Sequence, residues 1–267
     1  LTIAAGSVYV SADPRKIELE DCVPWDGVTD LNTYDAVWIV TEPEAWVGGV
    51  GMYDGDYLAV GATKTQTTKP SGGYAYYKDG TLTLNNYSYT GEGYLRNSSY
   101  GHYAAIYSKT DLTIKLVGSN TLTQTAAESD AVWVEGALTV GGSGSLTCTS
   151  TRYGFYAVGG DLTINSGTIV STSGLSGIKG YFGDVIINGG DITINSCTSA
   201  DLYEEAGIYA YEGDVVINGG NITANGGPKY GICSDFESVY INGGTVTAVG
   251  SKYAIKYGGE FAVADGL

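Results

Sequence analysis

The sequence predicts an all-β protein in which residues 81–267 form a right-handed, three-sided parallel β-helix. Residues 1–80 are expected to form an N-terminal β-rich cap or the end of a preceding module. Three observations predict the β-helix: a repeat of about 23 residues, three short runs of alternating apolar and polar residues per repeat, and an asparagine-rich turn at one place in it. One coil alone cannot bury its apolar residues, but coils stacked ~4.8 Å apart bury them together.

The repeat is plainest in the segments GDVIINGGDITI (183–194), GDVVINGGNITA (213–224) and ESVYINGGTVTA (237–248). Each copy is preceded by a segment that opens with Gly or Ala followed by an apolar residue. The openings at Ala131, Gly154 and Gly177 give a period of 23 residues (154 − 131 and 177 − 154). The next opening, Gly207, comes after 30 residues (207 − 177), which predicts a protruding insertion at about Ser196–Ala206.

The three runs of each repeat supply three columns of inward apolar residues, one for each side of the coil. The first run contributes Leu112, Leu138, Leu162, Val185, Val215 and Val239. The second contributes Leu122, Leu146, Ile169, Ile192, Ile222 and Val246, and the third contributes Ile106, Val132, Phe155, Ile178, Ile208, Ile232 and Ile255. Each buried aliphatic side chain stabilises the fold by roughly 1.5–3 kcal/mol, so the repeats supply an ample core. The right hand follows from the usual chirality of parallel crossovers.

A turn of asparagine and glycine separates the first run from the second. It reads Asn-Gly-Gly at 188–190, 218–220 and 242–244, and Asn-Ser-Gly at 165–167. Both residue types tolerate the positive φ angles of tight turns, and stacked asparagine side chains can hydrogen-bond from coil to coil. We favour this structural role over the alternative, a row of asparagines that binds a ligand.

Residues 1–80 differ from the repeats, because they hold three of the four tryptophans and show no clear register. Tyr74–Leu84 indicates a hairpin around Asp79-Gly80 that leads into the first coil. The segment before it is expected to cover the end of the solenoid, where strand edges would otherwise be unpaired.

The charge and hydropathy of the chain limit its partners. The formal net charge is −16, and a surface that acidic repels phosphate backbones and anionic membranes. Nucleic acid is therefore not an expected partner, whereas cations, calcium included, are tolerated. The chain holds no run of 18 apolar residues, so the sequence predicts no membrane insertion.

Four segments resemble repeats in β-helical surface proteins of anaerobic, gut-type Gram-positive bacteria. They are VGGV…YDGDYL (47–58), YAYYKDGTLTLNNY (74–87), AIYSKTDLTI (105–114) and GDVIINGGDIT (183–193). Some of the related modules are carbohydrate-binding, and these bind calcium, but no metal site is carried over from them to positions of this sequence. The resemblance covers about residues 47–267 and implies an extracellular location on the bacterial cell surface, next to other modules of a longer protein.

Aromatic residues recur in the third run, at the position between two inward neighbours, which should point outward. The row is Tyr107, Trp133, Tyr156, Lys179, Tyr209, Cys233 and Lys256, with Tyr153, Tyr181 and Tyr211 at flanking outward positions. Rings that are open to solvent at coil spacing suit stacking on the apolar faces of sugar rings. The candidate carbohydrate-binding residues are therefore Tyr107, Trp133, Tyr153, Tyr156, Lys179, Tyr181, Tyr209 and Tyr211. Two alternatives stay open, namely rings that only stiffen the face and a face covered by a partner module.

Charged residues also lie on or near this face. Lys179 and Lys256 give it positive charge, so an anionic glycan such as a pectin fragment is one candidate ligand. Asp161, Asp184 and Asp214 recur on consecutive coils at the turn before the first run, where calcium could relieve their mutual repulsion. We favour the interpretation in which each Asp caps its own Gly-Asp turn through backbone N–H groups, and we assign no cofactor.

The sequence offers few residues that could act as catalysts. The one histidine, His102, is expected to be a surface or turn residue, and only Lys179 or Arg152 could serve as the base of a polysaccharide lyase. The motifs of polygalacturonases are absent. The sequence therefore favours a non-catalytic, secreted polysaccharide-binding module of a bacterial surface protein. A passive stalk or adhesin scaffold is the alternative, and a β-helix lyase is a third.

Overall fold

The computed structural model describes residues 7–11, 23–24, 36–40, 42–196 and 205–264, and the chain divides into two compact units, Leu1–Pro43 and Glu44–Leu267. In the first unit, β1 (Ser7–Ser11), β2 (Val23–Pro24) and β3 (Ala36–Val40) form an antiparallel sheet in the order β2-β1-β3. The division expected between residues 80 and 81 lies inside the second unit, because residues 44–80 contribute strands to the solenoid.

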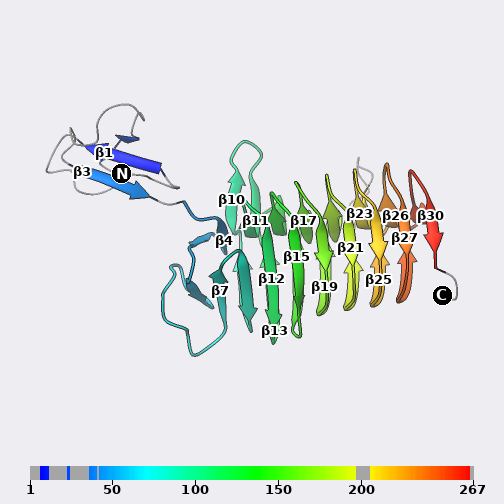
Figure 1. The fold of residues 1–267 in the computed structure, drawn as a ribbon, viewed down its shortest axis with the longest axis horizontal. Helices are drawn as coiled ribbons and strands as arrows, with labels where there is room; N and C mark the ends of the chain where they lie inside the picture. The colour runs from blue at the N-terminus through cyan, green and yellow to red at the C-terminus, as the bar shows by residue number, and fades with distance from the viewer. Residues whose placement is uncertain (1–6, 12–22, 25–35, 41, 197–204, 265–267) are drawn as a thin grey trace. The chain divides into compact units, whose positions relative to one another are not determined.

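The second unit is a parallel β-helix with three sheets, named sheets I, II and III in the order in which each coil visits them (Figure 1). Sheet I contains β5 (Val50–Met52), β4 (Ala45–Val47), β11 (His102–Ser108), β14 (Ser129–Val134), β17 (Phe155–Ala157), β20 (Ile178–Gly180), β23 (Ala206–Ala210), β26 (Tyr230–Ser234) and β29 (Tyr253–Lys256). A further strand, β10 (Tyr94–Asn97), pairs with β11.

The other two sheets follow the same order of coils. Sheet II contains β6 (Tyr57–Ala59), β7 (Tyr74–Lys78), β8 (Thr81–Asn85), β12 (Leu112–Val117), β15 (Leu138–Gly142), β18 (Leu162–Ile164), β21 (Val185–Ile187), β24 (Val215–Ile217), β27 (Val239–Ile241) and β30 (Phe261–Val263). Sheet III contains β9 (Ser88–Gly91), β13 (Ser119–Gln124), β16 (Ser145–Ser150), β19 (Thr168–Ser173), β22 (Asp191–Asn195), β25 (Asn221–Asn225) and β28 (Thr245–Val249). The described residues contain no helix, so the prediction of an all-β parallel β-helix is confirmed.

Antiparallel strands extend the N-terminal edge of two sheets. In sheet I, β4 pairs antiparallel with β11 and then with β5, and in sheet II, β7 pairs antiparallel with β8 and then with β6. The hairpin predicted over Tyr74–Leu84 is confirmed, since Asp79 and Gly80 form its turn with φ angles of 47° and 70°. Positive φ at both central residues is typical of the tight turn that joins twisted antiparallel strands.

The interior columns set the spacing of the coils. In sheet I, Val132 aligns with Phe155 after 23 residues (155 − 132), and Ile178 aligns with Ile208 after 30 residues (208 − 178). The longer coil carries the predicted insertion, of which residues 197–204 lie outside the described residues. The prediction that Ile178, Ile208 and Ile232 share one interior column is confirmed, because they align in turn and all three are fully buried.

One predicted alignment in sheet III is wrong. Leu122 aligns with Cys148, and it is Asn120 that aligns with Leu146. Asn120 is buried, yet its side chain accepts a hydrogen bond from the backbone N–H of Tyr87 at 2.8 Å and donates one to the carbonyl of Ser145 at 2.9 Å. Satisfied in this way, a polar side chain can replace an aliphatic one in the interior column.

The asparagine turns form a ladder of side chains. Asn188 donates to Asn165 at 2.8 Å, Asn218 donates to Asn188 at 2.8 Å, and Asn242 donates to Asn218 at 2.9 Å. The last residue of each turn takes the positive φ, which is 106° at Gly190. These bonds support the structural role of the asparagine row and link each coil to the next.

Candidate functional site

The predicted aromatic row lies on the outer face of sheet I. Trp133 aligns with Tyr107 on one side and with Tyr156 on the other, and Tyr156 aligns with Lys179, which in turn aligns with Tyr209. The side chains belong to two clusters that are separate from the solenoid core. The larger contains Trp46, Ala104, Tyr107, Trp133, Tyr153 and Tyr156, and the smaller contains Ala206, Tyr209, Tyr230 and Cys233. The outward direction that alternation predicted is therefore correct.

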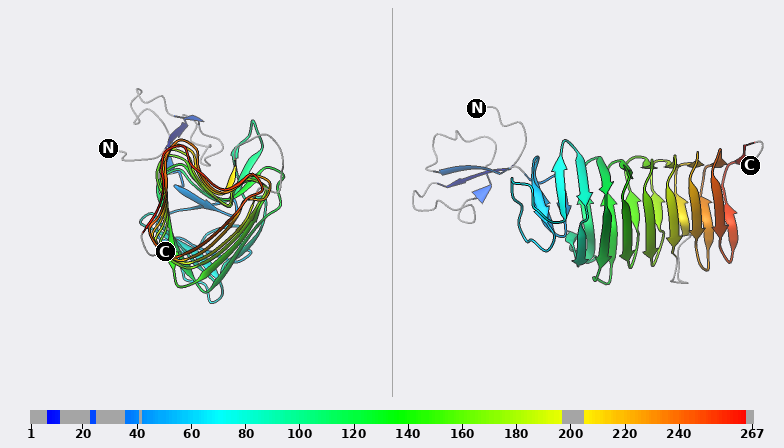
Figure 2. Two further views of the ribbon diagram at one scale, coloured as in Figure 1. Left: turned by 90° about the vertical axis from the view of Figure 1, so that its right-hand side faces the viewer. Right: turned by 90° about the horizontal axis from the view of Figure 1, so that it is seen from below.

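A sugar platform on this row requires rings that are open to solvent, and the structure does not meet this condition. Trp133, Tyr156 and Tyr209 expose 8%, 7% and 3% of their surface, and Tyr107, Tyr153 and Lys179 are also buried. Of the eight candidates, only Tyr181 and Tyr211 are partly exposed. Seen along the coils, the outline of the solenoid is indented on one side, and the β10–β11 hairpin rises beside the indentation (Figure 2, left).

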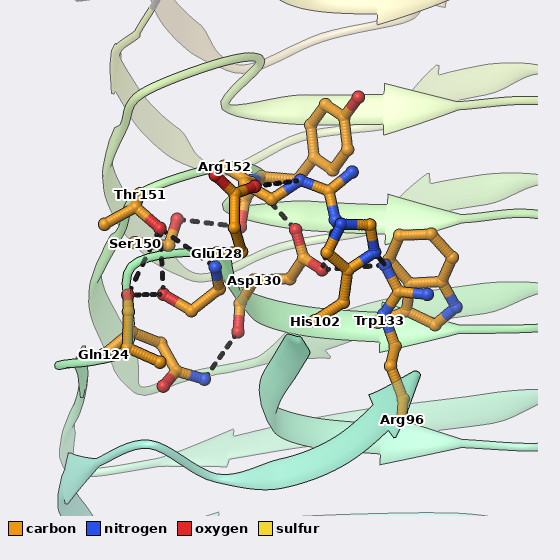
Figure 3. Close-up of polar contacts among 12 residues, drawn as sticks. Arg96, His102, Gln124, Glu128, Asp130, Trp133, Ser150, Thr151 and Arg152 are labelled. Carbon is orange, nitrogen blue, oxygen red and sulfur yellow. Dashed lines mark hydrogen bonds and ion pairs between the residues drawn. The ribbon is translucent and has the colours of Figure 1, made fainter. Parts of the chain in front are cut away.

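Residues outside the repeat pattern cover this part of the face. The guanidinium carbon of Arg96, on β10, lies 3.1 Å from the centre of the Trp133 ring, and Nε1 of Trp133 donates to Glu135 at 2.9 Å. Figure 3 shows Arg96 and His102 beside Trp133, with Asp130 between the side chains of Arg96 and Arg152. The β10–β11 hairpin is thus fastened to the aromatic row by a cation–π contact and by ion pairs.

Asp130 is the fully buried acid of this cluster. Its Oδ2 lies 3.4 Å from Nη2 of Arg96 and 3.9 Å from Nη1 of Arg152, and its Oδ1 accepts from the backbone N–H of Tyr153 at 3.1 Å. Burial raises the pKa of Asp130 to about 6, because the loss of water outweighs the pull of the two arginines in the opposite direction. Burial and the same arginines lower the pKa of His102.

A second buried network holds the end of the insertion. Oε1 of Glu205 accepts from Nζ of Lys179 at 2.9 Å and from the hydroxyl of Tyr153 at 3.2 Å, while its other oxygen accepts from Ser176. Burial raises the pKa of Tyr153 well above its usual range, and the Glu205 carboxylate adds to the shift. Lys179 is also within 4.9 Å of the centre of the Tyr209 ring. This lysine is a paired, buried cation rather than a charge that the face presents to solvent.

The second lysine of the row is paired as well. Nζ of Lys256 contacts Oδ1 of Asp235, and Oδ2 of Asp235 accepts from the hydroxyl of Tyr209 at 3.1 Å. Arg152, the other base considered for a lyase, lies 3.6 Å from Glu128 through Nε, in addition to its contact with Asp130. Each of the cations that sequence reasoning singled out is therefore matched to a carboxylate.

Exposed rings gather instead at the turn from sheet I to sheet II. There, Tyr181 stacks on Tyr211 with ring centres 4.8 Å apart and planes 19° apart. Phe182 packs edge-on against Tyr181 at 4.6 Å, and Phe236 packs edge-on against Tyr211 at 5.2 Å. Phe182 exposes 57% of its surface and Phe236 58%. We name these four residues, Phe182, Tyr181, Tyr211 and Phe236, the aromatic ladder.

The ladder is continuous with the buried row, because the Tyr156 and Tyr181 rings lie 6.4 Å apart and the Tyr209 and Tyr211 rings lie 6.5 Å apart. Sequence reasoning identified Tyr181 and Tyr211 but missed Phe182 and Phe236. A signal was present, since both phenylalanines fall in turns, where an apolar ring has no strand face to cover.

The aspartate row holds turns together from coil to coil. Oδ1 of Asp161 accepts from the backbone N–H of Asp184 at 2.9 Å, Asp184 accepts from that of Asp214 at 2.8 Å, and Asp214 accepts from that of Ser238 at 2.8 Å. Each carboxylate thus binds the turn of the following coil, contrary to the prediction that it caps its own turn. No group of three or more metal-ligating side chains is found within the described part of the chain.

A cavity of about 410 Å³ lies at the N-terminal end of the solenoid, between the β4–β5 turn, residues 60–63 and β9. Its wall includes Gly48, Tyr87 and Tyr89, and no charged residue lines it. None of the eight candidate residues takes part, so the cavity is separate from the ladder.

Within the described residues, no helix is long and apolar enough to cross a membrane.

Comparison with known proteins identifies the family. No curated protein and no solved structure matches the chain. A family model described as "Carbohydrate-binding domain-containing protein" matches residues 116–266, which is more than half of the chain and includes the aromatic ladder. The chain belongs to this family of carbohydrate-binding domain-containing proteins.

Proposed function

We propose that this chain is a non-catalytic, extracellular polysaccharide-binding module of a bacterial surface protein, and that the glycan stacks on the aromatic ladder. The family supports a polysaccharide partner. The observation that carries the choice of site is the pair of exposed rings, Phe182 and Phe236, at either end of the stacked pair Tyr181 and Tyr211.

The ladder has the properties that a sugar platform needs. Its rings present apolar faces and edges that match the C–H faces of pyranose rings, and its tyrosines add hydroxyl groups for the sugar hydroxyls. The buried row behind it holds Tyr181 and Tyr211 in place through ring contacts with Tyr156 and Tyr209. A platform that is rigid before binding loses less entropy when the ligand arrives.

A non-catalytic role is supported by the ion pairs of Lys179 and Arg152, the two candidate bases of a lyase. Lys179 is buried in its pair with Glu205, and Arg152 is engaged with Glu128 and Asp130. The Lys179 side chain is buried, and Arg152 exposes 15% of its side chain while contacting two carboxylates. A proton-abstracting base must reach the substrate directly or through one water molecule.

The location on the cell surface and the neighbouring modules are part of the same proposal, and they rest on the resemblance of the repeats to bacterial surface proteins. The suggestion of an anionic glycan rested on Lys179 and Lys256, and each of these cations is matched to a carboxylate. Charge at the site therefore gives no support to an anionic chain.

The experiment is a glycan-array screen, followed by affinity electrophoresis in gels that contain the glycans retained. The double variant Phe182→Ala/Phe236→Ala should weaken retention roughly ten-fold, because each ring contributes about 0.5–1.5 kcal/mol of stacking. Tyr100→Ala is the matched control, since Tyr100 exposes 71% of its surface and lies in the β10–β11 hairpin, outside the ladder. Equal retention of parent and double variant, or no retention of the parent, would replace the proposal by that of a passive stalk.

A further inference from the structure

We propose that the aromatic ladder selects a glycan that carries free amino groups. The glycan lies along the stack of coils, with one of its ammonium groups beside Glu212. This inference rests on the proposed function, because it names the class of glycan that the same ladder takes.

The register of the turn places Glu212 between two residues of the ladder, Phe182 and Phe236. The backbone N–H of Phe182 bonds to the carbonyl of Val158, and the N–H of Glu212 bonds to the carbonyl of Tyr181, so Glu212 occupies in its coil the place of Phe182 in the coil before. The N–H of Asp235 bonds to the carbonyl of Ala210, which gives Phe236 the same place in the following coil. The exposed column therefore reads Phe182, Glu212, Phe236 over three consecutive coils.

This column fixes the direction of the ligand. Neighbouring coils are ~4.8 Å apart, and an extended β-linked glycan advances by a similar length for each sugar. A chain that lies along the coils can therefore place one sugar on the ring of Phe182 and another on the ring of Phe236. The sugar between them lies opposite the Glu212 carboxylate. A chain that lies across the coils would meet only one of the two phenylalanines.

The charge around the column is negative. Glu212 and Glu237 are both exposed, and both lie at the turn that carries the ladder. The nearest lysines in the row, Lys179 and Lys256, are already matched to Glu205 and Asp235. A uronate polymer would bring its carboxylates against Glu212, whereas an amino-sugar polymer would bring ammonium groups there. The net charge of −16 acts in the same direction at longer range.

The test is calorimetry with three oligosaccharides of equal length at mildly acidic pH and low salt. They are a fully de-N-acetylated chitosan hexamer, the N-acetylated chitin hexamer and a hexamer of galacturonate. The parent protein should bind the chitosan hexamer most tightly and the galacturonate hexamer most weakly. Glu212→Gln should weaken chitosan binding about three-fold and leave chitin binding unchanged, as expected for the loss of one exposed ion pair. Added salt should remove the preference of the parent protein for the chitosan hexamer over the chitin hexamer.

The control variants separate this inference from the proposed function. Glu92→Gln removes one exposed negative charge away from the ladder and should leave the preference for chitosan intact. Phe182→Ala/Phe236→Ala should weaken chitosan and chitin alike. If chitin or galacturonate binds as tightly as chitosan in a ladder-dependent way, or if Glu212→Gln changes nothing, the inference is overturned and the proposed function stands. If none of the three hexamers binds, the inference also fails, and the array screen alone decides the proposed function.

Discussion

The ammonium of Lys179 lies 2.9 Å from Oε1 of Glu205, and both side chains are more than nine-tenths buried on the outer face of sheet I. Lys179 belongs to β20, whereas Glu205 lies at the end of the insertion and precedes β23. The pair therefore ties the end of the coil that carries the insertion to the strand with which that coil begins. Because the hydroxyls of Tyr153 and Ser176 also donate to Glu205, the charges are surrounded by hydrogen bonds as well as by rings.

The first prediction follows from this pair. Glu205→Gln should destabilise the protein by about 3–5 kcal/mol, because it leaves the Lys179 ammonium buried without an opposite charge. The double variant Lys179→Met/Glu205→Leu should recover most of that loss, since it removes both charges together. Unfolding in urea measures both effects, with the exposed Glu212→Gln as the control for loss of a carboxylate. A single variant as stable as the parent would show that the pair carries little of the stability.

Lys179 also shows what the sequence predicts about sheet I and what it leaves open. Alternation within the third run predicts correctly that Lys179, Tyr156 and Trp133 point away from the interior, because direction depends only on the pleat of the strand. Their burial depends on Arg96 and Glu205, which lie outside the repeat and reach the row through tertiary contacts. The repeat pattern carries no information about residues that lie outside the repeat.

The aromatic ladder is a second feature that the repeat pattern could not predict. Phe182 and Phe236 lie in turns, so no strand pattern assigns them a face. By contrast, the core could be predicted almost completely, because every inward position recurs from coil to coil. The misaligned Leu122 and Asn120 show the exception, in which a hydrogen-bonded polar residue replaces an aliphatic one.

The second prediction concerns the aspartate row and calcium. Asp184→Ala should cost about 1 kcal/mol, because it removes the acceptor for the backbone N–H of Asp214, whereas Asp184→Asn keeps an oxygen there and should be nearly neutral. Since the carboxylates already bind backbone groups, calcium or a chelator should leave the melting temperature of the parent unchanged. Micromolar calcium binding in calorimetry, abolished by Asp184→Ala, would contradict this reading.

The third prediction is a pH dependence that Asp130 causes. Its pKa is about 6 in the folded protein, compared with 3.8 for an exposed aspartic acid, so between these values the folded state binds the proton that the unfolded state has lost. The stabilisation from protonated Asp130 is therefore complete below about pH 4 and is lost as the pH rises towards about 6. The slope is at most about 1.4 kcal/mol per pH unit.

Comparison with Asp130→Asn isolates this effect, because asparagine does not titrate and other carboxylates contribute equally to both proteins. Urea unfolding across the range should show the parent losing stability relative to the variant as the pH rises from about 4 to about 6, with a constant difference above that. Curves that stay parallel throughout would show that Asp130 ionises in the folded state as easily as an exposed acid.

The last prediction separates the buried row from the exposed ladder. Trp133 exposes 8% of its surface, packs with Tyr156 at a ring distance of 4.2 Å and carries Arg96 over its face, so Trp133→Ala should cost about 3–5 kcal/mol. Phe182 exposes 57% of its surface, so Phe182→Ala should change stability by no more than about 0.5 kcal/mol. Thermal and urea unfolding of the two variants give the comparison. If Trp133→Ala melted with the parent, its ring would be open to solvent after all, and the row would return as a candidate platform. If Phe182→Ala were the less stable variant, the ladder would be part of the packing that holds the coils together.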